Sequence, residues 1–199
     1  CWVATSSPKC LAVSSTDTAP MLQALGARVH LVSAAGERWV DVADLYQNDG
    51  IHYTTRRADE VLASIEVPAE TGWRSTYWKL RRRGSFDFPV LSVAAAVRVG
   101  ADGTVQTARI VLGAVASRPL AAPKAEAALI NRAITDAAIA DAAEGAYEVA
   151  KPMDNTDFDL VWRKRMTRAL VGYALQELRG DDVRERRVKL ARQALTIVN

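Results

Sequence analysis

The sequence has few of the residues that carry common enzyme chemistry, with two cysteines and two histidines among 199 residues. Two cysteines are too few for a disulfide scaffold. Neither His30 nor His52 lies near a cysteine or carboxylate at a spacing typical of metal ligands. The chain also lacks a P-loop, a G-x-S-x-G elbow and a G-x-G-x-x-G fingerprint. These absences argue against nucleophilic, metal-hydrolytic and kinase chemistry, and we assign the histidines no role.

Neither charge nor hydrophobicity is extreme. The 26 Lys and Arg residues nearly balance the 23 Asp and Glu residues, giving a formal net charge of +3, which argues against a strongly basic nucleic-acid-binding protein. No stretch approaches the ~18 apolar residues that span a bilayer, and residues 1–10 do not resemble a secretory signal. We therefore expect a cytoplasmic protein with no membrane partner. Because the chain begins with Cys1 and not Met, we also expect a fragment of a longer protein.

The composition does supply material for a core. Hydrophobic residues make up 49% and charged residues 25% of the chain, as in ordinary globular domains. The order of apolar patterns predicts an α+β fold in three parts, namely residues 1–69, residues 70–180 and residues 181–199. The last part is a charged, amphipathic tail that we interpret as an accessory helix or a partly ordered segment.

Residues 1–69 are typical of a small α/β unit. Strands are predicted at residues 11–15, 27–32, 38–42 and 61–67. Pro20 in a first turn and Gly26 just past an end predict a short helix between the first two strands, with Asp17 as a candidate N-cap. A further helical turn is expected at residues 42–46.

Residues 70–180 are typical of an antiparallel sheet followed by helices. Strands are predicted at residues 76–83, 89–99 and 104–112, with a hairpin turn at residues 100–103. The second of these strands is almost entirely apolar, so we expect helices to cover it on one side. Pro123 begins an alanine-rich helix with one small-residue stripe, and a second long helix ends at Gly180.

The segment from Tyr77 to Pro89 concentrates cations and aromatic rings. An anionic, planar ligand would suit such a segment, because cations stabilise negative charge and an aromatic face covers a ring. The simpler interpretation is an exposed strand with a basic outer side. Nucleic-acid binding through Arg81 to Arg83 competes for the same residues, but the small net charge weakens it.

Cys1 and Cys10 are separated by eight residues in a polar segment. They are interpreted either as free thiols, as one local disulfide, or as half of a metal or iron–sulfur site whose other ligands lie outside this chain. Spacing alone favours the first two interpretations, because protein zinc sites usually use more closely spaced cysteine pairs.

Several motifs in a fixed order resemble one known family. The motifs read K-x-x-x-R, S-x-D-F-P, S-V-A-A-A and A-R-I-x-L-G-A-V-A-x-R-P, and they begin at Lys79, Ser85, Ser92 and Ala108. Together they resemble the C-terminal domain of the FAD-binding medium subunit of molybdenum hydroxylases, the xanthine and carbon monoxide dehydrogenase family. Upstream, the segments 15–27 and 59–68 resemble the second lobe of the FAD domain of that subunit. The resemblance covers residues 1 to about 180.

This resemblance implies a fold and a set of FAD contacts. The implied fold is the second lobe of a flavin-binding α/β domain followed by a three-stranded antiparallel sheet packed against a small helical bundle. Asp17 matches an acidic residue that hydrogen-bonds FAD, and helix capping by Asp17 is compatible with that role. Lys79 matches a lysine at the pyrimidine edge of the flavin, and Leu62 matches a position whose backbone contacts the ring. Asp87 and Phe88 complete the candidates, with Phe88 where some relatives shield the ring by an aromatic side chain.

Within the family, the chain most resembles the β subunit of 4-hydroxybenzoyl-CoA reductase. That subunit carries an additional loop with four cysteines that bind a [4Fe–4S] cluster, and the last two are spaced as Cys1 and Cys10 are. The resemblance therefore implies that both cysteines are cluster ligands in a longer chain. The interval from Lys79 to Asp87 is one residue longer than in the carbon monoxide and xanthine dehydrogenase branches, so Phe88 is displaced by one position relative to those branches.

The family's glycine-rich loops, which hold the FAD diphosphate, have no counterpart in this sequence. Because the backbone N–H groups of such loops form most of the anion cradle, we expect these residues alone to bind FAD weakly or not at all.

The resemblance implies an electron-transfer subunit. Its partners would be a large subunit with the molybdenum cofactor and a small subunit with [2Fe–2S] clusters. The alternative hypotheses are an assembly domain that does not bind flavin and, less favoured, a nucleic-acid-binding domain.

Overall fold

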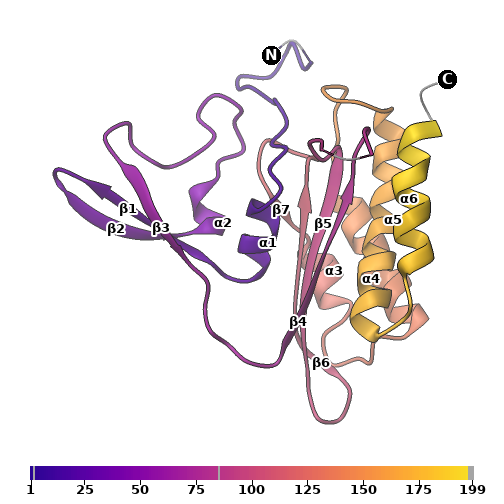
Figure 1. Ribbon diagram of the computed structural model, residues 1–199. Coiled ribbons are helices and arrows are strands. Elements are labelled where there is room, and N and C mark those ends of the chain that lie inside the picture. The colour runs from indigo at the N-terminus through magenta and orange to yellow at the C-terminus, as the bar shows by residue number, and fades with distance from the viewer. Residues whose placement is uncertain (2, 85, 197–199) are drawn as a thin grey trace.

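Two antiparallel sheets organise the chain, and most of the helices lie on one side of the larger sheet (Figure 1). The structure is a computed structural model that describes residues 1, 3–84 and 86–196. The fold is α+β, as the sequence predicts. In the part of the chain that the structure describes, no helix combines the length and apolar character needed to cross a membrane.

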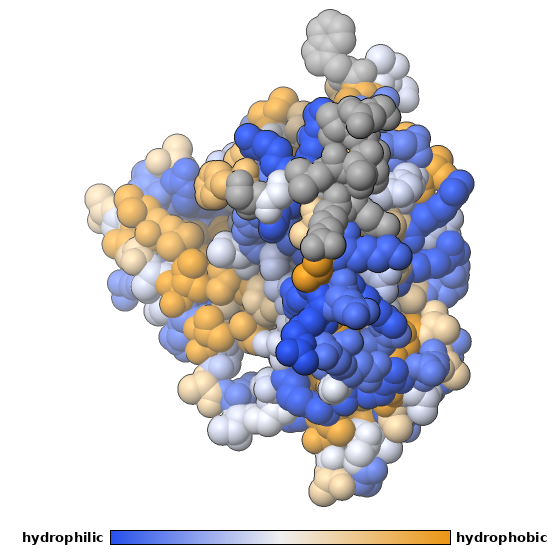
Figure 2. Space-filling view, turned by 45° about the vertical axis from the view of Figure 1, so that its right-hand side comes forward, coloured by the Kyte–Doolittle hydropathy of each residue, from blue (hydrophilic) through white to orange (hydrophobic). Residues whose placement is uncertain are grey.

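The smaller sheet has the strand order β2-β1-β3. Its strands are β1 (Arg28–Ser33), β2 (Gly36–Asp41) and β3 (Val61–Glu66), and the short helix α2 (Val42–Leu45) follows β2. Val29 and Leu31 of β1 form a small core with Val42 and Leu45 of α2. Alternation along β1 therefore buries one face of this sheet. Every residue of β3, by contrast, is exposed, and Figure 2 shows apolar side chains gathered over this lobe, at the left.

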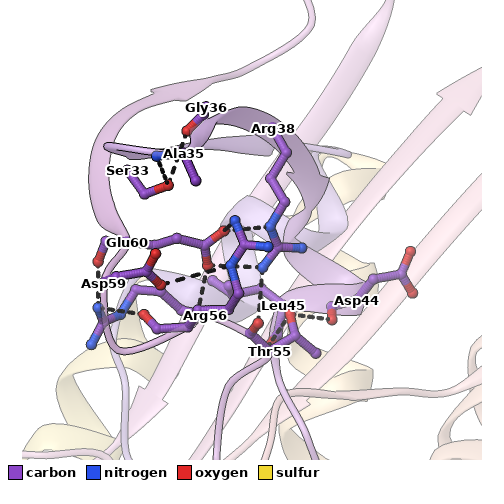
Figure 3. A network of polar contacts seen from close by, with 11 residues as sticks. Ser33, Ala35, Gly36, Arg38, Asp44, Leu45, Thr55, Arg56, Asp59 and Glu60 are labelled. Atoms are coloured by element: carbon purple, nitrogen blue, oxygen red, sulfur yellow. Dashed lines mark hydrogen bonds and ion pairs between the residues drawn. The ribbon is translucent and has the colours of Figure 1, made fainter.

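A buried carboxylate ties the loop before β3 to β2 (Figure 3). Glu60 is 2% exposed and accepts hydrogen bonds from Arg38 Nε at 2.6 Å and from the backbone N–H of Arg57 at 2.6 Å. The hydrogen bond from Arg38 is the main reason why the pKa of Glu60 falls to about 2, and the Arg57 N–H adds to it against the opposing effect of burial. The loop therefore enters β3 in a fixed position.

The larger sheet has the order β4-β5-β6-β7. Its strands are β4 (Trp73–Leu80), β5 (Leu91–Val99), β6 (Val105–Gly113) and the two-residue β7 (Leu120–Ala121). The first three strands confirm the sequence-based prediction, and β7 adds a short fourth. Seven of the nine residues of β5 are buried, because this central strand is covered on both faces.

Four helices cover one face of the larger sheet, and one short helix covers the other (Figure 1). The first group is α3 (Pro123–Ala127), α4 (Asp136–Val149), α5 (Leu160–Arg179) and α6 (Arg184–Thr196). Val93 and Ala95 of β5 join the core beneath these helices. Ala94 and Ala96 point the other way and pack with Ala24 of α1 (Ala19–Ala24). The expected cover of helices on one side is confirmed, and α1 on the other side is an addition that the sequence did not predict.

Three local predictions were wrong. Residues 11–15 form no strand, and in the described chain Ser14 N–H donates a single backbone bond to Ala116 O at 3.0 Å. Asp17 does not cap α1, because Thr18 is the N-cap residue and no side chain caps it. The alanine-rich helix is broken between α3 and α4, since the intervening segment bonds to β6 instead: Asn131 N–H donates to Val105 O at 2.8 Å, and Val105 N–H donates to Arg132 O at 2.9 Å.

The second long helix, α5, is confirmed, and Gly180 ends it as predicted, with a φ of 112°. Its N-cap is Asp159, which the sequence analysis did not name and which accepts from Trp162 N–H at 2.8 Å. The charged tail forms α6, as one of the two interpretations predicted. The domain boundaries at residues 69/70 and 180/181 stay a prediction.

Candidate functional site

Lys79 and Asp17 form an ion pair at the end of β4. Lys79 Nζ lies 2.7 Å from Asp17 Oδ1 and 2.9 Å from Oδ2. The side chain of Lys79 is only 17% exposed, whereas that of Asp17 is 49% exposed. The two residues are 62 positions apart in the sequence and come together because α1, which follows Asp17, packs on the face of the sheet to which Lys79 points. This is the pairing on which the flavin hypothesis depends.

Tyr77 completes this cluster. Residues two apart on a strand share a face, and the Tyr77 hydroxyl lies 3.5 Å from Asp17 Oδ1. Burial is the main cause that raises the pKa of Tyr77 to about 12, and the charge of Asp17 acts in the same direction. The site therefore contains a cation, a carboxylate and a neutral phenol. The sequence placed Tyr77 in the segment suited to an anionic, planar ligand but did not single it out as a site residue, although its spacing from Lys79 was a usable signal.

A cavity of about 260 Å³ lies next to this cluster. Thr16, adjacent to Asp17, lines it together with Tyr53, Phe88 and Ser117. Phe88 is 71% exposed and Tyr53 is 55% exposed, so two aromatic rings stand at an open edge. Neither Lys79 nor Asp17 lines this cavity itself, and the sequence-based prediction of an anionic, planar ligand in this region stays a prediction.

Asp87 organises the loop between β4 and β5. Its carboxylate accepts from Arg83 N–H at 2.8 Å and from Arg83 Nη2 at 2.9 Å. The Arg83 side chain is the main cause that holds the pKa of Asp87 well below its ordinary range. Both oxygens of Asp87 are thus engaged by its own loop, and its assignment as an FAD-binding residue stays a prediction.

The basic run from Arg81 to Arg83 is largely neutralised by neighbouring groups. Arg82 pairs with Asp157 at 2.7 Å and Arg83 with Asp87 at 2.9 Å. Arg81 donates to the carbonyl oxygens of Arg83 and Gly84. Cations already paired in this way provide less free charge for phosphates, so the geometry does not favour a nucleic-acid interface.

Leu62 is not part of this cluster. It lies on β3 of the smaller sheet, opposite Leu31 in the strand register, and is 41% exposed. The contacts of the described residues do not link it with Lys79 or Asp17. A contact between its backbone and the flavin stays a prediction.

Cys1 and Cys10 line one open cavity of about 840 Å³, near His52 and Asp49. Among the described residues both thiols are free, and no group of three or more His, Cys, Asp and Glu side chains is arranged to hold a metal ion. A [4Fe–4S] cluster takes four cysteine ligands. The residues described here therefore do not fit a cluster by themselves, and the role of the two cysteines as ligands in a longer chain stays a prediction.

Arg163 of α5 hydrogen-bonds to three loops of the larger domain, those after β4, after β6 and before α5. Its side chain is fully buried and donates to Val90 O at 3.0 Å, Met153 O at 2.9 Å and Ala114 O at 2.5 Å. Burial lowers the pKa of this guanidinium. Ala114 has a φ of 60°, a conformation that a side-chain-bearing residue rarely adopts without support.

Two family models match the chain. The model described as "CO dehydrogenase flavoprotein C-terminal domain" matches residues 75–178, and the one described as "FAD binding domain in molybdopterin dehydrogenase" matches residues 6–70. The chain therefore belongs to the family of FAD-binding medium subunits of molybdenum hydroxylases. This confirms the family resemblance found in the sequence, and the particular branch with a [4Fe–4S] cluster stays a prediction.

Curated relatives agree with this assignment. The chain is 30% identical over 162 residues to the carbon monoxide dehydrogenase medium chain of Afipia carboxidovorans, covering 80% of this chain and 54% of that protein. It is 27% identical over 171 residues to the glyceraldehyde dehydrogenase medium chain of Sulfolobus acidocaldarius, covering 84% of this chain and 59% of that protein. The chain thus spans little more than half the length of these relatives.

Solved structures share the fold. A chain of carbon monoxide dehydrogenase from Hydrogenophaga pseudoflava superposes with a TM-score of 0.75 at 30% identity, covering 81% of this chain and 55% of that chain. A chain of quinoline 2-oxidoreductase from Pseudomonas putida 86 gives a TM-score of 0.69 at 26% identity, covering 92% of this chain and 59% of that chain.

Proposed function

We propose that these residues form part of an FAD-binding electron-transfer subunit. In the whole enzyme, this subunit would relay electrons between iron–sulfur centres and an external donor or acceptor. Its partners would be a large subunit with the molybdenum cofactor and a small [2Fe–2S] subunit, in a cytoplasmic complex. The observation that carries the proposal is the ion pair between Lys79 and Asp17, which follows directly on Thr16 in the wall of a cavity that Phe88 also lines.

FAD, when bound, supplies the electron transfer. Lys79 would provide a largely buried cation for the flavin, and a cation there would stabilise negative charge and so raise the reduction potential. Asp17 holds the ammonium group of Lys79 and offers its exposed oxygen edge to polar groups of the cofactor. Phe88, whose side chain is exposed, would shield the ring from water. The diphosphate would be held by glycine-rich loops outside this sequence.

Substitution of Lys79 tests the proposal. In the assembled protein, Lys79→Met removes the cation without removing much side-chain volume, so we expect a lower FAD content or a reduction potential lowered by about 30–60 mV, since 30 mV of a two-electron couple corresponds to about 1.4 kcal/mol. Lys124→Met is the matched control, because Lys124 also pairs with a carboxylate, that of Glu148, but on the helical side of the large sheet. Unchanged potential and FAD content in Lys79→Met would remove Lys79 from the site.

The alternative, an assembly domain that does not bind flavin, makes a different prediction. A protein extended by its glycine-rich loops would then be purified colourless. A yellow protein with a flavin spectrum would reject that alternative.

A further inference from the structure

We propose that two residues of β6, Gly113 and Arg109, are positioning residues for the candidate flavin site. They fix helix α1 against the large sheet, and the position of α1 determines whether Asp17 meets Lys79. Asp17 lies three residues before Pro20, which is in the first turn of α1. The importance of this ion pair for FAD rests on the proposed function, whereas the positioning itself does not.

Gly113 lies under the start of α1. It is buried and shares a row of the large sheet with Lys79, because Lys79 pairs with Ser92 and Ser92 pairs with Gly113. A Cβ atom at position 113 would lie 2.2 Å from Ser92 Oγ and 2.9 Å from Pro20 Cγ. The Ser92 hydroxyl can rotate away, but the Pro20 ring is rigid and belongs to the helix. Glycine therefore lets α1 approach the sheet closely, at the level of Lys79.

Arg109 holds the other end of α1. It lies four residues before Gly113 on β6, so both residues face α1. Its Nη1 donates to Ala24 O at 3.3 Å and would lie 2.7 Å from a Cβ atom at Gly26, which has a φ of 71°. The ring of Trp73 lies 4.7 Å from the guanidinium carbon and supports the side chain by a cation–π contact. The end of α1 is therefore attached to β6.

A methyl group at position 113 is expected to move Asp17. Closely packed interiors transmit such strain, because they contain little empty space to absorb it. Since Arg109 fixes the far end of α1, the displacement of Pro20 falls on the segment before it, which carries Asp17. Asp17 Oδ1 lies 2.7 Å from Lys79 Nζ, and a shift of about 1 Å away from Nζ exceeds hydrogen-bond distance.

Acylation of Lys79 tests this positioning without using FAD. Full-length protein stripped of FAD is treated briefly with the N-hydroxysuccinimide ester of acetic acid, and labelling at each lysine is quantified by mass spectrometry. An amine held against a carboxylate reacts slowly, so we expect Gly113→Ala to raise Lys79 labelling about two- to fivefold, the protection that one partly exposed ion pair gives. Gly172→Ala is the matched control, because a Cβ atom there would meet only Ile139 Cγ2, at 3.9 Å, and it should leave Lys79 labelling unchanged.

Two further variants separate the effect on α1 from general damage. Pro20→Ala removes the ring atom that the new methyl group meets, so its combination with Gly113→Ala should restore most of the protection of Lys79. If Gly113→Ala does not fold, Arg109→Met decides the question. It releases the other end of α1 and should also raise Lys79 labelling, whereas Arg74→Met, at an exposed position of β4, should not.

Titration of FAD into the stripped protein connects this positioning with the flavin. We expect Gly113→Ala to bind FAD at least about threefold more weakly, as the loss of one hydrogen bond gives, and Pro20→Ala to restore the affinity. Unchanged Lys79 labelling in a folded Gly113→Ala, or in Arg109→Met where Gly113→Ala does not fold, would overturn the inference, as would raised labelling with unchanged FAD affinity. Unchanged FAD content and potential in Lys79→Met would instead reject the proposed function and leave the labelling result standing.

Discussion

Lys79 depends on its neighbours for its position. An ion pair between exposed side chains contributes only about 0–1 kcal/mol, and Asp17 is half-exposed, so the pair with Asp17 adds little to overall stability. Its effect is to fix the ammonium group at one place at the end of β4. Tyr77 extends this arrangement, because its hydroxyl lies 3.5 Å from Asp17 Oδ1, the carboxylate oxygen that also lies 2.7 Å from Lys79 Nζ.

The phenol of Tyr77 is expected to lose its proton at a higher pH than an ordinary tyrosine. Its folded pKa of about 12 lies above the ordinary value of 10, so the unfolded chain ionises first and stability falls as the pH rises from about 10 to 12. We expect ultraviolet absorbance titration to show a tyrosinate component near pH 12 that disappears in Tyr77→Phe. The exposed Tyr53 gives the control, since Tyr53→Phe should retain that component. A component near pH 12 that persists in Tyr77→Phe would contradict the assignment.

The cluster could be predicted only in part from the sequence. Asp17 and Lys79 were found through a family resemblance, because no local rule connects residues 62 positions apart. Tyr77 shares the face of Lys79, but a tyrosine on a strand is more often a packing residue than a site residue. Asp87 matched a motif, and its oxygens are occupied by Arg83, a contact within one loop that the motif does not encode.

The packing of the central strand β5 could not be predicted from its own sequence pattern. Its continuous apolar run indicated burial, but not that alternate residues face two different cores. The alanine-rich stretch after Pro123 has a helical period throughout, yet the backbone between α3 and α4 bonds to Val105 of β6. Helix propensity is a weak preference that tertiary hydrogen bonds override.

The loop before β3 is expected to be sensitive to acid. The folded pKa of Glu60, about 2, lies below the ordinary value of 4.5, so its stabilising effect is complete above about pH 4.5 and is lost as the pH falls towards 2. Hydrogen exchange followed from pH 5 to pH 2.5 should therefore show the amides of the small sheet losing protection before those of β5. Glu60→Gln should remove this pH dependence and lower protection at pH 7.

The exposed Glu66 of β3 gives the control for this experiment, since Glu66→Gln should keep the acid sensitivity of the small sheet. The interpretation would be wrong if Glu60→Gln and the unchanged protein lost protection at the same pH.

On the scale of the whole molecule, helix α1 joins the two sheets. It precedes the strands of the small sheet in the sequence but packs against β5 and β6 of the large sheet (Figure 1). The sequence predicted this short helix, but not which of the two sheets it covers. Its packing brings Asp17 to Lys79, the pair on which the proposed function depends.

The buried Arg163 connects helix α5 with the loops near the candidate site, so we expect its substitution to lower the stability of the protein. Its guanidinium joins α5 to the carbonyl groups of Val90, Ala114 and Met153, and an arginine stays charged even where burial lowers its pKa. In Arg163→Leu these carbonyls lose their donors, so we expect the free energy of unfolding in urea to fall by about 3–5 kcal/mol. Lysine lacks the planar fork that reaches several acceptors, so Arg163→Lys should recover less than half of the loss.

The exposed Arg165 of the same helix is the matched control for Arg163, and Arg165→Leu should change the unfolding free energy by less than about 0.5 kcal/mol. Because the Arg163 bonds hold loops that adjoin residues 11–17, Arg163→Leu should also speed hydrogen exchange at Ser14, whose N–H bonds to Ala116 O, more than at β1. If Arg163→Leu and Arg165→Leu unfold at the same urea concentration, these loops are held by their apolar packing, and the guanidinium contributes no more than its neighbours do.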